Sequence, residues 1–310
     1  MRARIRRSVV LVAALALGVT GCTDASKSDT GGTAAPASGQ PSSELVLPRV
    51  DPAIAALFPD AVKAAGEIQL AADPSYPPST FKDDSGEIVG IGPDLAAAVT
   101  AKAGLKIKWV EVPFDGMLGG LQAKRFAASW AGWSITAERL QILNFVTFLK
   151  GGTSVLVKSG NPTGVKAVED LCGKNVAVQT GTTQAQQVLD ELQKKCEAAG
   201  KAKITDVQLP QQTNVNQAVA TGRAEALLAD NSLTAYQAKI QPGVFEAVPS
   251  VLIQPVDVGV AIPKSDTRLT DALAAAFNAI IADGTYGKVL ARWEITNAAV
   301  AKSEINPAAS

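Results

Sequence analysis

Beyond residue 66 the chain alternates short apolar segments with longer segments whose apolar residues recur at the period of an α-helix. The short segments predict strands at Ile68–Ala72, Lys106–Val112, Ala127–Ile135, Thr153–Lys158, Asn175–Gln179, Val207–Pro210 and Ala226–Ala229. The longer segments predict helices at Asp94–Ala103, Gly116–Lys124, Thr183–Ala199, Asn214–Thr221, Ser232–Lys239, Leu269–Asp283 and Gly287–Trp293. This alternation of strands and helices predicts an α/β fold.

The first residues have the pattern of an export signal. A basic segment, Met1–Arg7, precedes the apolar segment Ser8–Val19, which is shorter than the roughly 20 residues that span a bilayer. Val19-Thr20-Gly21-Cys22 follows and resembles the bacterial lipobox, with Val19 in place of the usual Leu. We therefore expect residues 1–21 to be a lipoprotein signal peptide and Cys22 to be lipidated, which anchors the protein to the cell membrane outside the cytoplasm. An ordinary signal peptide followed by an unrelated cysteine is the alternative.

The segment after Cys22 has the composition of a linker. Thr23–Ser43 is rich in Ser, Thr, Gly, Pro and Ala and has almost no large apolar residues. Such a segment cannot bury enough surface to offset its chain entropy. Residues 22–43 are therefore predicted to be a flexible tether.

Charge and composition exclude several functions. Removal of the leader takes away four arginines and no acid, which leaves 25 basic and 29 acidic residues. This balance argues against nucleic-acid binding and against a polybasic membrane contact. The chain has no histidine, so it has no Ser-His-Asp triad and no imidazole metal site. Gly90-Ile91-Gly92 lacks the third glycine of a dinucleotide fingerprint, and we expect no cofactor and no metal.

Two cysteines remain beyond the lipobox. Cys172 and Cys196 are 24 positions apart, and an oxidising compartment favours a disulfide between them. Two buried free thiols are the alternative.

Several short motifs between Glu67 and Trp293 follow one another in a characteristic order. They are Ala72-Asp73-Pro74-Ser75-Tyr76-Pro77-Pro78, Glu87-Ile88-Val89-Gly90, Val112-Pro113-Phe114-Asp115-Gly116, Ser134-Ile135-Thr136-Ala137-Glu138-Arg139, Val178-Gln179-Thr180-Gly181-Thr182-Thr183, Gly222-Arg223-Ala224-Glu225-Ala226 and Asp283-Gly284-Thr285-Tyr286. In this order and spacing the chain resembles the family-3 extracellular solute-binding proteins, which are the polar amino acid receptors of ABC importers.

The resemblance implies a two-lobed, periplasmic-binding-protein-like fold of type II. Its ligand cleft lies between two α/β lobes that are joined by two hinge strands. Lobe 1 is expected to comprise residues 50–151 and 255–298, and lobe 2 residues 152–254. Residues 299–310 are expected to form a C-terminal tail.

The resemblance also implies residues for the carboxylate of a bound amino acid. Arg139 matches the family arginine that binds this group, a role that suits a guanidinium fork. Thr182 and Thr183 follow Gly181 at a helix start, where their N–H groups can reach the same carboxylate. Ser134 matches a further contact. The alternatives are a solvated surface arginine and simple N-capping by a threonine.

The rest of an amino acid is assigned to residues from both lobes. Asp230 and the carbonyl of Gly132 match the contacts of the ammonium group, whereas a turn or cap role is the alternative for Asp230. Tyr76 and Phe114 match the two aromatic residues that enclose the apolar stem, or else they are core residues. Asp73 binds a polar side chain or caps the Pro-rich turn.

Trp130 and Trp133 depart from the family, which usually has aliphatic residues there. Strand alternation places them on opposite faces, and one of them is expected to enter the cleft and reshape the side-chain pocket, or both are packing residues. Asp73, Gln184 and the small pair Ala131-Gly132 favour glutamine or a basic amino acid.

The expected function is therefore capture of a polar amino acid by a monomeric receptor, which delivers it to the membrane permease of an ABC-type importer. A sensor subunit of a membrane signalling protein uses the same cleft and is an alternative. A dehydratase-like enzyme on this fold is disfavoured, because the chain lacks histidine and keeps the Arg139–Asp230 pair.

Overall fold

The computed structural model describes residues 45–248 and 250–309. The predicted signal peptide, the tether and Cys22 lie outside these residues. Within the described ranges, no helix is long and apolar enough to cross a membrane.

The described residues form one large mixed sheet and one small antiparallel sheet. The large sheet has the strand order β5-β1-β6-β12-β7-β10-β8-β9, and β11 pairs with β7 outside this order. Its strands are β1 Glu67–Ala72, β5 Lys106–Glu111, β6 Ala128–Ser134, β7 Leu143–Lys158, β8 Asn175–Gln179, β9 Thr205–Leu209, β10 Ala226–Asp230, β11 Phe245–Ala247 and β12 Ile253–Pro263. The small sheet comprises β2 Ser75–Tyr76, β3 Thr80–Lys82 and β4 Ile88–Val89.

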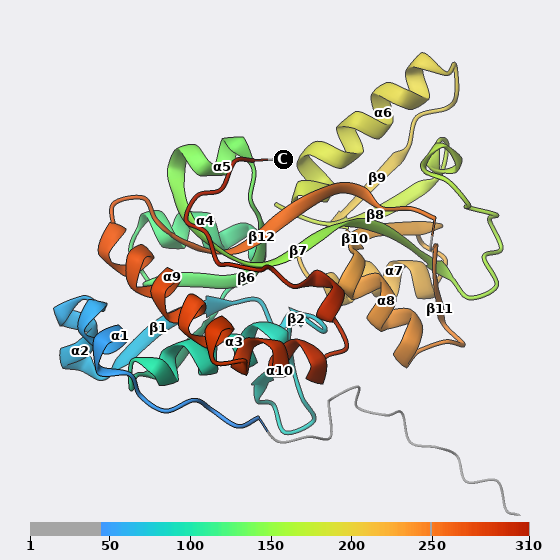
Figure 1. Cartoon of the computed structure of the whole chain (residues 1–310). Coiled ribbons are helices and arrows are strands. Elements are labelled where there is room, and N and C mark those ends of the chain that lie inside the picture. Colours follow the sequence, from blue (N-terminus) through green and yellow to red (C-terminus); the bar gives the residue numbers. More distant parts are fainter. Residues whose placement is uncertain (1–44, 249, 310) are drawn as a thin grey trace, which may run out of the picture. The chain divides into compact units, whose positions relative to one another are not determined.

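The helices divide into two groups along the large sheet (Figure 1). Those near β1, β5 and β6 are α1 Pro52–Leu57, α2 Asp60–Ala65, α3 Ile91–Lys102, α4 Phe114–Gln122, α5 Ala137–Ile142, α9 Thr267–Ala282 and α10 Thr285–Arg292. Those near β8, β9 and β10 are α6 Leu189–Ala198, α7 Gln212–Ala220 and α8 Asn231–Ile240. Short helical turns are η1 Val168–Leu171, η2 Gln184–Val188 and η3 Thr296–Ala298. We call the first group with its strands lobe 1, and the second group with its strands lobe 2.

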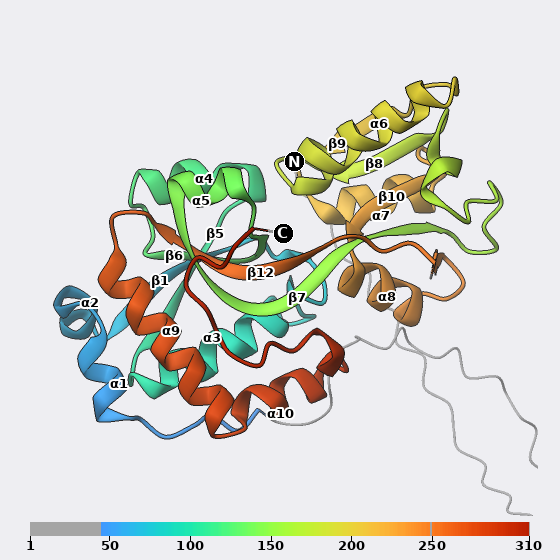
Figure 2. The ribbon, with the colours of Figure 1, turned by 45° about the horizontal axis from the view of Figure 1, so that its top comes forward.

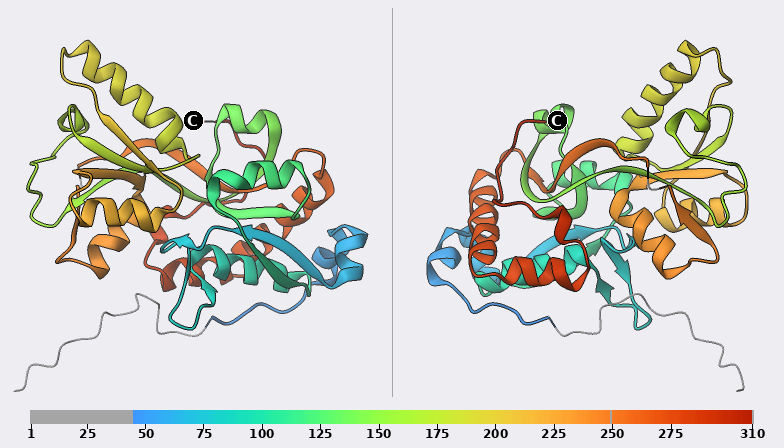
Figure 3. Two further views of the ribbon diagram at one scale, coloured as in Figure 1. Left: turned by 180° about the vertical axis from the view of Figure 1, so that it is seen from behind. Right: turned by 45° about the vertical axis from the view of Figure 1, so that its right-hand side comes forward.

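Strands β7 and β12 run through both lobes and pair with each other (Figure 2). Both strands also connect the lobes when the protein is seen from behind (Figure 3). β7 pairs with β10 only after Gly152, and β12 pairs with β6 only after Asp257. The residue boundaries expected for the two lobes remain a prediction.

The sequence pattern did not predict β12 and gave only the second part of β7. Residues 143–148 are buried throughout, so this part of β7 has no alternation of apolar and polar positions. A strand that is covered on both faces lacks the period of two on which such a prediction depends.

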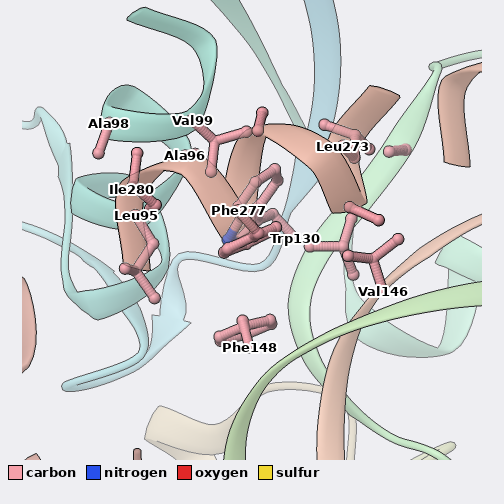
Figure 4. Close-up of a cluster of buried hydrophobic side chains, with 14 of the residues drawn as sticks. Leu95, Ala96, Ala98, Val99, Trp130, Val146, Phe148, Leu273, Phe277 and Ile280 are labelled. Carbon is pink, nitrogen blue, oxygen red and sulfur yellow. The ribbon is translucent and has the colours of Figure 1, made fainter. Parts of the chain in front are cut away.

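Each lobe has its own hydrophobic core. The core of lobe 1 contains a stack of aromatic rings around Trp130, which lies beside Phe277 and Phe148 (Figure 4). The ring centroids of Trp130 and Phe277 are 5.4 Å apart. Trp133 belongs to a separate cluster with Phe114 and Met117. The prediction that the two tryptophans face opposite ways is therefore confirmed.

The core of lobe 2 is closed by a disulfide. Cys172 and Cys196 are bonded, which links the end of η1 to α6, and the predicted pair is therefore confirmed. The helix predicted at Thr183–Ala199 consists of the π-helical turn η2 followed by α6.

Candidate functional site

All nine residues predicted to bind a ligand line one cavity where the two lobes meet. These residues are Asp73, Tyr76, Phe114, Gly132, Ser134, Arg139, Thr182, Thr183 and Asp230. Five further residues complete its lining: Ser79, Thr80, Ala131, Gln179 and Gln184. The structure thus brings together the whole predicted set from segments far apart in the sequence.

The ends of four strands position polar side chains of the cavity. Asp73 follows β1, Ser134 ends β6, Gln179 ends β8 and Asp230 ends β10. Because the carboxyl ends of these strands point toward the junction of the lobes, the polar residues placed there converge. Phe114 is the first residue of α4, which begins two residues before the predicted helix start. At this position the backbone N–H of Phe114 donates a hydrogen bond to Asp73 Oδ2 at 3.2 Å.

Arg139 lies in the first turn of α5, whose N-cap Thr136 accepts a hydrogen bond from the Arg139 N–H at 3.3 Å. Its Nη1 donates to the carbonyl of Ser134 at 3.0 Å, and its Nη2 donates to the carbonyl of Gly181 at 3.1 Å. Two of its five N–H groups are thus used, and three remain for a ligand. Burial lowers the pKa of Arg139 to about 10, so the guanidinium stays charged at neutral pH.

Two aromatic rings lie beside this guanidinium. Its Cζ is 4.8 Å from the centroid of Trp133 and 5.8 Å from that of Phe114. The indole N–H of Trp133 donates to Ser129 Oγ at 2.9 Å, which fixes the ring. Neither tryptophan lines the cavity, so the expectation that one enters the cleft is wrong. Trp130 is packed in the core of lobe 1, whereas Trp133 reaches the site only through its contact with Arg139.

Asp230 is the acid of lobe 2 in this cavity. Its Oδ1 accepts a hydrogen bond from Gln184 Nε2 at 2.9 Å, and its backbone N–H donates to the hydroxyl of Tyr76 at 3.0 Å. Burial raises the pKa of Asp230 to about 6, and the contacts of Gln184, Tyr76 and Arg139 only partly oppose this effect. Gln184 therefore holds Asp230 in place, because its amide N–H donates to this carboxylate.

Asp73 lies on the other lobe and accepts hydrogen bonds from three groups. Its Oδ1 accepts from the Ser75 N–H at 3.1 Å, and its Oδ2 accepts from the Phe114 N–H and from Gln179 Nε2 at 2.7 Å. Burial raises its pKa, although these hydrogen bonds favour the ionised form. Asp73 thus caps its turn, as one of its two predicted roles requires, and it also faces the cavity.

The two threonines follow the tight turn at Gly181. The hydroxyl of Thr182 donates to the carbonyl of Gln179 at 2.7 Å and accepts from the Ala185 N–H at 3.3 Å, so Thr182 caps the helical turn. The hydroxyls of Thr183 and Ser134 are 3.3 Å apart, which joins lobe 2 to lobe 1.

Five hydrogen bonds cross directly between the lobes at or beside the cavity. They join Asp73 to Gln179, Arg139 to Gly181, Ser134 to Thr183, Tyr76 to Asp230, and Ser75 to Gln212. The cavity measures about 20 Å³, which corresponds to roughly one water molecule. An amino acid therefore enters only if the lobes separate, which is the hinge motion expected for this architecture.

The sequence pattern does not reveal the roles of two polar residues of the site. Gln179 stands out only as part of a motif, and Gln184 only as a residue that favours a polar solute side chain. Both residues lie close to Gly181, which forms the turn where the lobes meet. Gln179 is the last residue of a predicted strand before this turn, and that position is the sequence signal that points to it. In the described part of the chain, no group of acidic residues or cysteines could hold a metal ion.

The site pairs a guanidinium with a carboxylate from the facing lobe in a buried cavity. Such a cavity, between two α/β lobes joined by two long strands, defines a two-lobed binding protein. Residues 68–296 match the family model described as bacterial extracellular solute-binding proteins, family 3. The chain belongs to this family, as predicted, and it is a solute-binding protein and not an enzyme.

Curated relatives agree with this membership. The chain is 31% identical over 263 residues to the arginine-binding protein ArgT of Corynebacterium glutamicum, a match that covers 85% of this chain and 86% of the relative. It is 31% identical over 232 residues to the histidine-binding periplasmic protein of Escherichia coli K12, which covers 73% of this chain and 86% of the relative.

Solved structures confirm the fold. An ancestral arginine-binding protein bound to arginine has a TM-score of 0.67 and 29% identity, and the match covers 74% of this chain and 98% of that structure. The holo arginine-binding protein of T. maritima has a TM-score of 0.64 and 26% identity, with 76% and 100% covered. The predicted two-lobed fold of type II is thereby confirmed.

Proposed function

We propose that this protein captures a polar amino acid, glutamine or one with a basic side chain, outside the cytoplasm and delivers it to an ABC-type importer. The observation that carries the proposal is the convergence of Arg139, Asp230 and Asp73 in one interlobe cavity. A free amino acid carries a carboxylate and an ammonium at fixed separation. A guanidinium on lobe 1 and a carboxylate on lobe 2 are complementary to these two charges.

The assignment of contacts follows from the donors and acceptors on each side. The carboxylate binds the three remaining N–H groups of Arg139, with help from Ser134 and from the helix start at Thr182 and Thr183. The ammonium binds Asp230 and the carbonyl of Gly132. Tyr76 and Phe114 enclose the apolar stem between them.

The name of one relative and the description of one solved structure support arginine as the solute. A further solved structure is described as an ancestral arginine-binding protein bound to glutamine, so glutamine is the main competing solute.

The first test is a thermal-shift screen of residues 23–310, the chain without its signal peptide and lipid-bearing cysteine, against the common L-amino acids after dialysis. A solute at about a thousand times its dissociation constant stabilises the protein by about 4 kcal/mol, which raises the unfolding midpoint visibly. The shift should be lost in Arg139→Ala and kept in Arg223→Ala, since Arg223 is exposed and lies outside the cavity. No shift with any free amino acid would refute the proposal.

We further propose that Cys22 is lipidated and that the tether, residues 22–43, lets the binding domain stand off the membrane. The support is the order of basic segment, apolar segment and Val19-Thr20-Gly21-Cys22. In cells, the full chain should fractionate with membranes and incorporate labelled fatty acid, whereas Cys22→Ala should be released. Equal release of both forms contradicts the anchor.

A further inference from the structure

One amide of the site has its orientation fixed by its neighbours. Gln179 is only 1% exposed, and its Nε2 lies 2.7 Å from Asp73 Oδ2 and 3.2 Å from the carbonyl of Pro210. Both neighbours are acceptors, so only the NH₂ end of the amide can face them. The two N–H groups of Gln179 are therefore both engaged, and its Oε1 points elsewhere.

That oxygen is buried and has no hydrogen-bond partner among the described residues. A buried acceptor without a partner is costly, and Gln179 lines the cavity. A solute that donates an N–H to this oxygen removes the cost.

Asp73 beside it also offers only acceptor atoms. None of the ion pairs among the described residues includes Asp73, although it is buried. A buried carboxylate without a cationic partner is unfavourable, and a cation from the solute supplies that partner.

The charges that line the cavity also favour a solute with a cationic side chain. The charged residues of the lining are Asp73, Asp230 and Arg139, which carry a net charge of −1 when all three are ionised. A zwitterion with a cationic side chain carries +1 and balances them, whereas glutamine carries no net charge.

We infer that Gln179 is a specificity-determining residue: with Asp73 it gives the side-chain end of the pocket only acceptors, which selects guanidinium or ammonium side chains against glutamine. A glutamine side chain can turn its two N–H groups toward these acceptors, but its carbonyl oxygen then needs a donor that neither Asp73 nor Gln179 has left, whereas guanidinium and ammonium groups carry donors only. The hydroxyls of Ser79 and Thr80 also line this cavity, but each can turn to donate or accept and favours neither solute. This inference rests on the proposed function and names its substrate class.

The test compares dissociation constants of L-arginine, L-lysine and L-glutamine for the full mature chain by titration calorimetry. The wild-type protein should bind arginine or lysine at least roughly tenfold more tightly than glutamine, because an unpaired acceptor in a buried site costs that much or more. In Gln179→Met, which keeps the length and removes both polar ends, the preference for arginine over glutamine should fall roughly tenfold.

Two further variants separate specificity from structure. Gln179→Glu still offers only acceptors and should keep the preference for cations, although its absolute affinities fall. Gln208→Met is the matched control, since Gln208 makes the same amide contact to Asp206 Oδ2 at 2.7 Å on the exposed side of β9. It should change nothing.

Three outcomes overturn the inference. Tighter binding of glutamine than of arginine by the wild-type protein does so and leaves the amino acid receptor intact. An equal loss for all three solutes in Gln179→Met does so too, since it reduces Gln179 to a contact between the lobes. Failure of the wild-type protein to bind any amino acid contradicts the proposed function itself, and the inference with it. Circular dichroism of each variant establishes that it is folded.

Discussion

At the residue scale, the guanidinium of Arg139 is held by two backbone carbonyls and by the face of Trp133. The carbonyls fix two of its N–H groups, and the ring fixes the plane in which the other three lie. A cation near an aromatic face gains about 0.5 to 2 kcal/mol, depending on its exposure to water. Trp133 therefore positions the group that is proposed to bind the solute carboxylate, although Trp133 itself does not line the cavity.

Trp133→Leu should lower the affinity for the solute roughly three- to tenfold, because the guanidinium loses its planar support. Trp133→Phe keeps an aromatic face and should recover most of the affinity. Calorimetric dissociation constants measure both effects. Trp109→Leu serves as the control, since Trp109 lies on the edge strand β5 and packs only against the core of lobe 1. An effect of Trp133→Leu no larger than that of Trp109→Leu contradicts the role.

Asp230 predicts a pH dependence of binding. Its pKa is raised to about 6 by burial, so the carboxyl is protonated in much of the protein below pH 6. An ammonium group binds the ionised form, and the proton must therefore leave before the solute binds. Affinity should fall by up to about tenfold per pH unit as the pH drops from 6 to 5, and it should change little above pH 7.

Titration calorimetry at pH 7.5, 6 and 5 checks this expectation. Asp230→Asn should bind weakly at all three values and lose this dependence. Asp73 is the other acid of the cavity whose pKa is raised by burial, and its own effect on binding would remain in that variant. Equal wild-type affinity at pH 7.5 and pH 5 would show that Asp230 does not hold the ammonium group.

The protonation of Asp230 affects the stability of the fold in the opposite direction to solute binding. An acid whose pKa is raised on folding destabilises the folded state at pH values above that pKa, since the buried form resists ionisation. The contribution of Asp230 therefore becomes less unfavourable as the pH falls from about 6 toward the ordinary carboxyl range. Acidification therefore weakens solute binding through Asp230, but it does not destabilise the fold through this residue.

At the element scale, the turn between β8 and η2 closes the two lobes on each other. Gly181 has a φ of +81°, and a Cβ atom on it would lie 3.1 Å from the Cα of Asp115 in α4. Its carbonyl also accepts the hydrogen bond from Arg139. Glycine is thus required here for the left-handed backbone and for the close approach of lobe 1.

Gly181→Ala should reduce affinity roughly tenfold or more, because the added methyl group separates the lobes at the point of closure. Gly200→Ala is the matched control, since Gly200 has a φ of +64° and no atom within 4 Å of the added Cβ. Both variants should lose about 1 to 2 kcal/mol of stability from the left-handed backbone, and only Gly181→Ala should lose affinity. Calorimetry and urea unfolding give the two quantities.

The disulfide stabilises lobe 2 by joining η1 to α6. Closure of the loop, whose cysteines are 24 positions apart, contributes about 3 kcal/mol by chain entropy. The variant Cys172→Ala/Cys196→Ala should unfold at a lower urea concentration by that amount. A reducing agent should shift the wild-type protein and leave the double variant unchanged, and no shift of the wild-type protein contradicts the expectation.

At the scale of the whole binding domain, the C-terminal segment extends along β7 of lobe 1. Glu304 accepts a hydrogen bond from the Thr147 N–H at 2.9 Å, Asn306 donates to the Phe145 carbonyl at 3.0 Å, and Val300 is buried in the core of lobe 1. The segment therefore covers the edge of β7 that its other strand partners leave open.

Removal of residues 299–310 should cost about 2 to 4 kcal/mol of stability, because it removes the buried Val300 and leaves several hydrogen-bonding groups of β7 without their partners. Urea unfolding measures the loss. Removal of residues 307–310 alone should have little effect. The dissociation constant of the shorter chain should stay unchanged, as none of these residues lines the cavity. A large loss of affinity contradicts this separation between stability and binding.

The sequence alone determined the α/β class, most strands of the large sheet, the pairing of the two cysteines and nine of the residues that line the cavity. The strands and helices follow from apolar periodicity and the disulfide from an oxidising compartment, whereas the nine residues follow from the resemblance to a known family. The nine residues predicted for the site are recognisable because they lie in or beside short motifs that match the family-3 solute-binding proteins in order and spacing.

The tertiary structure decided what depends on contacts between distant segments. It showed that β7 and β12 run through both lobes, since strands buried on both faces carry no period of two. It showed that Trp133 contacts the guanidinium of Arg139, whereas the strand pattern predicted only that Trp130 and Trp133 lie on opposite faces of the strand. It also fixed the amide of Gln179, because the two acceptors that orient it, Asp73 and Pro210, come from residues 106 and 31 positions away in the chain.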